Sequence, residues 1–127
     1  MRSDPKPAWM AEPESHDFTA AEHFLMLMLH KRHVSIALER LHKRRRKACT
    51  FAAKDILRAA ELAPLPAGNE GVAAKLAQIR TGRPLSPVLL VRPKTGPLVL
   101  ADGYHRVSAG HLIDESTMIP SVLVSIP

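Results

Sequence analysis

The chain has 127 residues, of which 46% are hydrophobic and 4% aromatic, and its formal net charge is +6. This length and apolar content favour one folded domain and exclude wholesale disorder. The single cysteine, Cys49, excludes an internal disulfide and a multi-cysteine zinc site, and we expect it to be a small buried filler. No apolar run is long enough for a membrane span or a signal peptide, so a cytoplasmic protein without membrane contact is expected.

The positive charge is concentrated in one short segment. Residues 31–47 hold eight of the eighteen Lys and Arg residues and a single acidic residue, whereas residues 1–30 are net negative. Five consecutive basic residues close the segment: Lys43, Arg44, Arg45, Arg46 and Lys47. Such a run either contacts DNA phosphates or is a solvated helix end, where cations complement the helix dipole. No aromatic residues interleave with it, so stacking of single-stranded bases is not indicated.

The N-terminal part is expected to be a flexible tail, residues 1–15, followed by a helical extension, residues 16–47. Thr19–Glu22 has the pattern of a capping box and predicts a helix start, with the helix ending near residue 30. The apolar run 24–29 is most simply core, and a homodimer face is the sharper alternative. A second amphipathic helix is predicted by the helical spacing of Val34, Ala37, Leu38 and Leu41.

From residue 48 onward the sequence predicts alternating short strands and helices. The expected strands are 48–52, 88–91, 98–100 and 119–126, and the expected helices are a turn around Ile56 and Leu57, then 69–80 and 104–113. Proline-containing stretches separate these elements. The order predicts a small mixed β-sheet in an α+β fold that carries an N-terminal helical hairpin.

A strand-turn-helix pattern at residues 98–109 carries the functional prediction. Gly103 has no Cβ, so a ligand can approach the backbone, and the helix that follows offers unpaired amides and the positive end of its dipole. Arg106 adds a fork for two phosphate oxygens, His105 adds a donor, and Asp102 could orient a magnesium shell or His105. Alternatively, Asp102 is a plain cap, Gly103 a plain turn residue, and the other two face solvent. The local pattern alone does not decide between these interpretations.

This pattern resembles the motif of the ParB/sulfiredoxin superfamily. Gly103, Arg106 and Ala109 match the Gly-x-x-Arg-x-x-Ala of ParB proteins, and residues 103–106 are similar to the Gly-Cys-His-Arg of sulfiredoxins. Residues 102–106 also resemble the Asp-Gly-His-His-Arg of free serine kinases. The likeness extends from about Cys49 to the C-terminus, and includes the Pro-Leu-Pro loop and the closing strand. It implies a ParB/sulfiredoxin-like domain over residues 48–127.

The resemblance also implies a ligand. In these relatives the motif holds the phosphates of ATP, ADP or CTP, usually with Mg²⁺. Carried over residue by residue, the nucleotide-binding set in this chain is Asp102, Gly103, Tyr104, His105 and Arg106. If the protein is an enzyme, a nucleotide-dependent phosphotransferase or nucleotidase is implied, in which positioning and charge neutralisation do most of the catalysis. Glu61, Glu70 and Asp102 are the candidate catalytic carboxylates, and nothing in the sequence selects one.

Three departures limit the resemblance. Tyr104 stands where sulfiredoxins have their nucleophilic cysteine, and a phenol cannot replace that thiolate, so sulfiredoxin activity is rejected. The basic residue that the family carries before Pro-Leu-Pro is Ala63 here, which removes one expected phosphate contact. The sequence also lacks the helix-turn-helix and dimerisation domains of full ParB proteins, so we do not expect a complete centromere-binding protein.

Two alternatives belong to other functional classes. One is a DNA-binding module that uses residues 43–47 and has a vestigial nucleotide pocket, and the other is a protein-interaction module whose apolar first helix docks on a partner. His23, His30 and His33 could lie on neighbouring helical faces, as zinc or nickel ligands do. No carboxylate or cysteine completes that set, so surface histidines are expected and no metal site is predicted.

Overall fold

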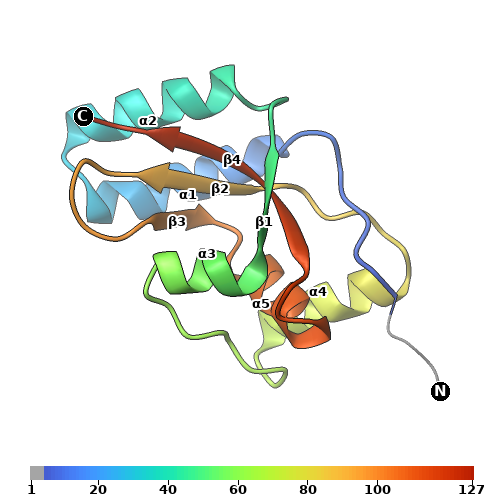
Figure 1. Ribbon diagram of the computed structural model, residues 1–127. Coiled ribbons are helices and arrows are strands. Elements are labelled where there is room, and N and C mark those ends of the chain that lie inside the picture. The colour runs from blue at the N-terminus through green and yellow to red at the C-terminus, as the bar shows by residue number, and fades with distance from the viewer. Residues whose placement is uncertain (1–4) are drawn as a thin grey trace.

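The computed structural model describes residues 5–127, which form five helices and a four-stranded mixed sheet (Figure 1). The elements in chain order are α1 (Ser15–Met28), α2 (Lys31–Lys43), β1 (Cys49–Ala52), α3 (Ala53–Ala59), α4 (Glu70–Arg80), β2 (Val88–Arg92), β3 (Val99–Asp102), α5 (Tyr104–Ile113) and β4 (Met118–Ser125). The strands lie in the order β1-β4-β2-β3. β4 is antiparallel to β1 and parallel to β2, and β2 is antiparallel to β3. The predicted α+β fold with an N-terminal helix pair is confirmed.

Both faces of the sheet are covered by helices because the side chains of each strand alternate. Along β2, Leu89 and Val91 face the core beneath α1 and α2, whereas Val88 and Leu90 face the core beneath α3 and α5. Helix α4 packs against α5 in a third, smaller core. The two N-terminal helices therefore cover one face of a sheet whose four strands all follow residue 48.

Most predicted elements after residue 48 are confirmed within two residues. Helix α4 begins where Asn69 was expected to cap it, and the Asn69 side-chain oxygen accepts a hydrogen bond from the Val72 amide at 3.1 Å. The helix ends at Arg80, followed by Gly82 with a φ of +78°. The segment between α3 and α4 is irregular, as its prolines require.

The predicted start of the first helix is wrong. Helix α1 begins at Ser15, and the capping box is formed by Glu14 and Asp17, not by Thr19–Glu22. The Glu14 amide donates to Asp17 Oδ2 at 2.9 Å, and the Glu14 side chain accepts from the Asp17 backbone in return. The Glu14–Asp17 and Thr19–Glu22 patterns overlap in the region where the helix begins, and the earlier one supplies the hydrogen bonds at its start.

The expectation that the apolar run 24–29 is core is also wrong for most of it. Leu25 is fully buried, but Met26 is 64% and Leu27 85% exposed, and Phe24 and Met28 are largely exposed as well. A helix lying on a sheet turns only one side inward, so consecutive residues cannot all be buried. The structure therefore leaves an apolar surface at the end of α1.

Two further expectations need correction. Residues 8–10, expected to belong to a loose tail, are fixed by hydrogen bonds from the Leu85 amide to the Ala8 carbonyl (2.8 Å) and from the Met10 amide to the Leu85 carbonyl (2.7 Å). Residues 1–4 of that expected tail lie outside the described residues. Cys49 is exposed and is not a buried filler, because it begins an edge strand whose first two residues face solvent. Across residues 5–127, no helix has the length and apolarity needed to traverse a bilayer.

Candidate phosphate-binding site

A single glycine joins β3 to α5. Gly103 has φ +117° and ψ 16°, in the left-handed region that side chains avoid. A Cβ at this position would lie 2.4 Å from Val88 Cγ1 and 2.9 Å from Arg106 Nη2. Both the backbone angle and the surrounding space therefore require glycine here.

The first turn of α5 has no side-chain cap. The first helical hydrogen bond runs from the Val107 amide to the Gly103 carbonyl at 2.9 Å. The amides of Tyr104, His105 and Arg106 therefore have no carbonyl within the helix to donate to. None of the hydrogen bonds found in residues 5–127 uses these three amides. Amides of this kind, at the positive end of a helix dipole, favour an anion.

The loop before α4 lies along this turn. The Tyr104 hydroxyl donates a hydrogen bond to the Ala63 carbonyl, and the Leu65 amide donates to Ser108 Oγ at 3.0 Å. The Tyr104 hydroxyl therefore ties the Pro-Leu-Pro loop to the start of α5.

The N-termini of α4 and α5 lie next to each other. The exposed His105 imidazole packs against Gly71, where an added Cβ would be 2.5 Å from His105 Cδ2. At the other ends of the two helices, Arg80 and Ile113 line one hollow. The helices therefore run in the same direction, and their positive dipole ends meet near His105.

Arg106 does not stand free beside the turn. Its side chain is 7% exposed, and its Nη1 lies 3.3 Å from Asp17 Oδ1 while its Nη2 donates to Asp102 Oδ2 at 2.9 Å. Its Nε is buried without an acceptor among the described residues. The guanidinium that we expected to hold phosphate oxygens is thus shared by two carboxylates, one of them from α1.

The two carboxylates differ in their ionisation. For Asp17, burial acts to raise the pKa, but hydrogen bonds from the Ser86 side chain and the Glu14 amide and the charge of Arg106 together lower the pKa below its ordinary value. For Asp102, burial outweighs the charge of Arg106, and the nearby Asp17 adds to it, so the pKa is raised. By these pKa directions Asp17 holds its charge more readily than Asp102, although Asp102 makes the shorter contact with Arg106, 2.9 Å against 3.3 Å.

The structure does not join the other candidate residues to this turn. Glu61 and Glu70 are exposed, and none of their interactions within the described chain reaches the start of α5. His30 caps α2, since its Nδ1 accepts the Arg32 amide at 3.2 Å, and its ring lies 6.4 Å from that of His33. Residues 5–127 contain no group of three metal-ligating side chains.

Sequence reasoning missed Asp17, which lies 89 positions from its partner Arg106. A local signal existed, because Asp17 is one and two helical turns before the buried Ala21 and Leu25. An acidic residue on the buried side of a helix requires a partner. The sequence does not identify that partner.

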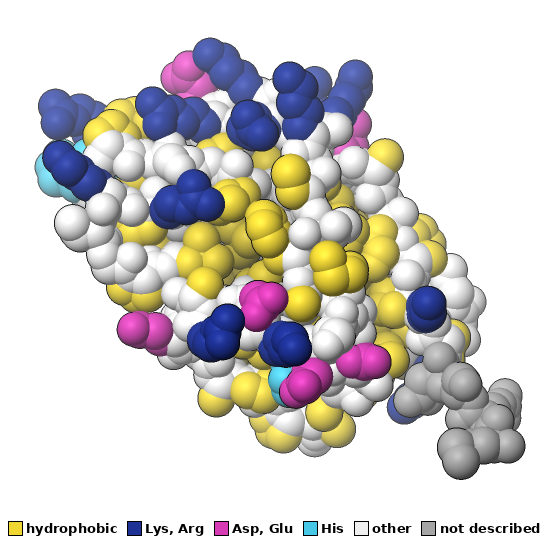
Figure 2. All heavy atoms as spheres, viewed as in Figure 1, with side chains coloured by type: hydrophobic (Ala, Val, Ile, Leu, Met, Phe, Trp, Pro, Cys, Tyr) yellow, Lys and Arg dark blue, Asp and Glu magenta, His cyan; other side chains and the backbone are white. Residues whose placement is uncertain are grey.

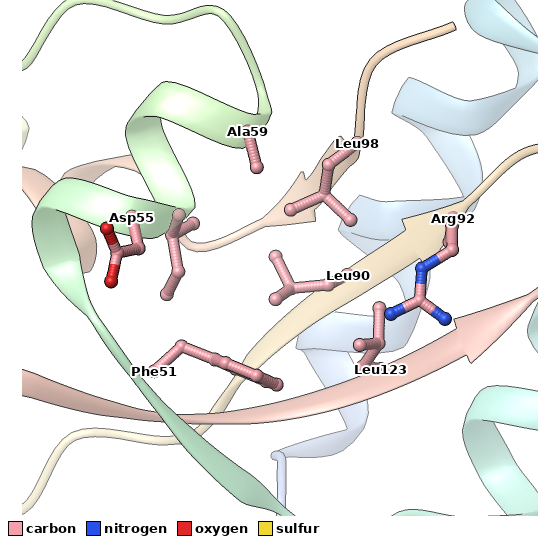
Figure 3. Close-up of a pocket in the computed structure, with 8 residues that line it drawn as sticks. Phe51, Asp55, Ala59, Leu90, Arg92, Leu98 and Leu123 are labelled. Atoms are coloured by element: carbon pink, nitrogen blue, oxygen red, sulfur yellow. The ribbon is translucent and has the colours of Figure 1, made fainter. Parts of the chain in front are cut away.

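A separate hollow of about 360 Å³ opens on the sheet face beside α3 (Figure 3). Its floor is apolar, with Leu90 at the centre, and Asp55 and Arg92 lie at opposite ends of it. No residue of the 102–109 motif lines this hollow, so it is distinct from the α5 turn.

Comparison of this chain with protein-family models, curated proteins and solved structures found no match.

Proposed function

We propose that this chain binds the phosphate groups of a nucleotide at the N-terminus of α5. The observation that carries the proposal is the uncapped first turn of α5, which offers three amides without a partner in the described chain. These amides follow Gly103, where the positive φ and the nearby Val88 side chain leave no room for a Cβ. The adjacent α4 N-terminus adds a second positive dipole end. The resemblance of residues 102–109 to the ParB/sulfiredoxin motif supports the same ligand and the same type of sheet.

The donors at this turn suit a phosphate. Phosphate oxygens only accept hydrogen bonds, and the turn offers the amides of Tyr104, His105 and Arg106 and the His105 ring. Because both Nη atoms of Arg106 are held by carboxylates, we assign the principal contacts to the amides and to His105. Arg106 acts as a positioning residue that ties Asp102, and with it the end of β3, to α1.

Magnesium would neutralise phosphate charge when bound with the nucleotide. Of the three candidate carboxylates, Asp102 lies beside the turn but is paired with Arg106. Glu61 and Glu70 are exposed, and no hydrogen bond or ion pair of the described chain holds them at the turn, so either would have to move to the bound phosphate to complete a magnesium shell. Phosphoryl transfer or nucleotide hydrolysis would need one of these three groups beside the terminal phosphate. Binding alone is tested first.

The test is a thermal-shift series with ATP, ADP, CTP and GTP, each with and without Mg²⁺. A nucleotide at 100 times its Kd should stabilise the fold by about 2.7 kcal/mol. In His105→Glu, the new carboxylate in the first turn should stabilise the helix by about 0.3–1 kcal/mol but repel phosphate, so the nucleotide shift should disappear. The matched control, His111→Glu, places the same charge in the last turn of α5 and should keep the shift.

Two outcomes contradict the proposal. One is that no nucleotide raises the unfolding temperature of the wild-type protein. The other is that His105→Glu and His111→Glu respond equally to the nucleotide that stabilises the wild type, because binding then does not use this turn.

A further inference from the structure

Seven cationic side chains gather on one side of the molecule, along α2, the turn that follows it and the end of β2. Figure 2 shows Lys and Arg side chains concentrated along the α2 edge of the visible face. All are exposed except the half-buried Arg45. We call this set the α2 basic surface: Arg40, Lys43, Arg44, Arg45, Arg46, Lys47 and Arg92.

Only two carboxylates neutralise the α2 basic surface within residues 5–127. Glu39 pairs with Lys43 at 3.2 Å, and Glu12 pairs with Arg46 at 2.8 Å and Arg45 at 3.7 Å. An excess of five positive charges remains. The helix dipole favours cations only within the last turn of α2, so it does not explain why Lys47 and Arg92 also lie on this side of the molecule.

A groove runs beside these cations. β1 pairs with β4 only over residues 118–121, so the outer edge of β4 from Val122 to Ser125 has no partner strand in the described fold. A hollow of about 410 Å³ lies between this edge and α2, and it is lined by Arg40, Lys43, Arg44, Leu123, Val124 and Ser125. The free edge and the cations thus face the same space.

The edge is guarded against another strand. Arg40 donates a hydrogen bond to the Ser125 carbonyl, and Arg92 Nη1 donates to Ser125 Oγ at 3.2 Å. A guanidinium on an edge carbonyl blocks strand addition, and charged side chains commonly protect sheet edges in this way. An acidic peptide that adds to the sheet as a strand is therefore disfavoured. The cations can instead each contact an anionic group of a ligand that does not pair with the edge.

We propose that the α2 basic surface binds the phosphate backbone of double-stranded DNA without reading its sequence. The surface contributes Arg40 and Lys43 from the last turn of α2 and five more cations from the following turn and the end of β2. Its excess of five positive charges matches about five backbone phosphates, which carry one negative charge each. The surface contains no Phe, Tyr or Trp that could stack on unpaired bases, so a duplex is favoured over a single strand. This proposal is independent of nucleotide binding at α5.

The test uses Arg44→Gln/Lys47→Gln, because neither residue forms an ion pair with any described carboxylate. The matched control is Arg80→Gln/Arg83→Gln, which removes the same charge from the end of α4 and the turn after it, again from residues with no ion pair in the described chain. Fluorescence anisotropy with a 20-base-pair duplex is measured over a salt series. Thermal unfolding of each variant checks the fold.

For five phosphate contacts, the slope of log affinity against log salt should be about −4.5 in the wild type. Arg44→Gln/Lys47→Gln should reduce its magnitude by about 2 and weaken binding about tenfold, while the control changes affinity less than about twofold. Equal weakening by both double variants, or a slope near zero, overturns the proposal. So does binding of poly-glutamate or of the single strand as tightly as the duplex. His105→Glu should leave duplex affinity unchanged, which separates this test from the nucleotide test.

Discussion

The guanidinium of Arg106 is shared by Asp17 and Asp102, and replacing each carboxylate with its isosteric amide tests which one the fold depends on. Asp17→Asn should lower the free energy of unfolding at neutral pH by about 3–5 kcal/mol, the usual cost of breaking a buried ion pair. The two oxygens of the Asp17 carboxylate accept from different donors, Oδ1 from Arg106 and Oδ2 from the Glu14 amide. Asparagine has one acceptor oxygen and adds two N–H donors, so it cannot accept from both sides.

Asp102→Asn should cost about 1.5 kcal/mol or less, a value typical of one hydrogen bond. The raised pKa of Asp102 means that the folded state holds this charge less readily than the unfolded chain does. The neutral amide removes that penalty, and its oxygen still accepts from Arg106 Nη2. The two substitutions are chemically identical and lie on the same guanidinium, so each is the control for the other.

The pH dependence has opposite signs at the two sites. The folded-state pKa of Asp17 lies below its ordinary value of 3.8, so its contribution to stability is present above that value and is lost as the pH falls through the folded-state pKa. The folded-state pKa of Asp102 lies above 3.8, so its contribution is fully present below that value and is lost as the pH rises through the folded-state pKa. Asp102→Asn should therefore abolish the loss of stability that accompanies a rise in pH through the folded-state pKa of Asp102. Asp17→Asn should abolish the loss of stability that accompanies a fall in pH through the folded-state pKa of Asp17.

Urea unfolding monitored by circular dichroism between pH 3 and pH 7 measures both effects. The decisive quantity is the difference in unfolding free energy between the two variants at pH 7. Equal losses, or a larger loss for Asp102→Asn, would refute the expectation that the fold depends more on the charge of Asp17 than on that of Asp102.

Three further experiments test the packing. Gly103→Ala should lower the free energy of unfolding, measured in urea, by about 2–5 kcal/mol, because of backbone strain and overpacking. Adding Val88→Ala to this variant should restore only the part that is due to overpacking. Full restoration would show that the φ of residue 103 causes no strain. Leu25→Ala should cost about 2–5 kcal/mol, whereas Leu27→Gln, on the exposed side of α1, should stay within about 0.5 kcal/mol; similar losses would mean that both residues are core. Cys49 should react with a thiol reagent in the native protein at the rate of the urea-unfolded chain, and reaction only after unfolding would contradict its exposure.

Elements with a strong local signal were predictable. Asn69 caps α4 because its side chain accepts a hydrogen bond from the amide three residues ahead, and this contact depends on nothing distant in the fold. Gly103 marks the turn into α5 for a similar reason, since only glycine adopts its φ without strain. At the start of α1 two capping patterns overlap in the sequence, and local chemistry alone could not rank Glu14 above Thr19.

What the sequence could not supply depends on contacts across the fold. The exposure of Leu27 follows from how α1 lies on the sheet, and that of Cys49 from the position of β1 at the sheet edge. The partnership of Asp17 with Arg106 joins opposite ends of the chain. A motif can predict that an arginine lies beside the turn into α5, but only the tertiary structure shows that two carboxylates share its guanidinium.

The expected boundary at residue 48 separates two sequence textures, yet one hydrophobic core crosses it. Leu25 of α1 and Leu41 of α2 pack on the same cluster as Leu89, Val91 and Val122 of the sheet. Burial of each side chain contributes roughly 1.5–3 kcal/mol, so uncovering these three sheet residues alone would cost about 5–9 kcal/mol. That is comparable with the entire stability of an ordinary domain, about 5–15 kcal/mol. Because α1 also supplies Asp17 to Arg106, the helical pair is part of what holds the α5 turn in place, and the proposed phosphate site and the α2 basic surface belong to one cooperative unit.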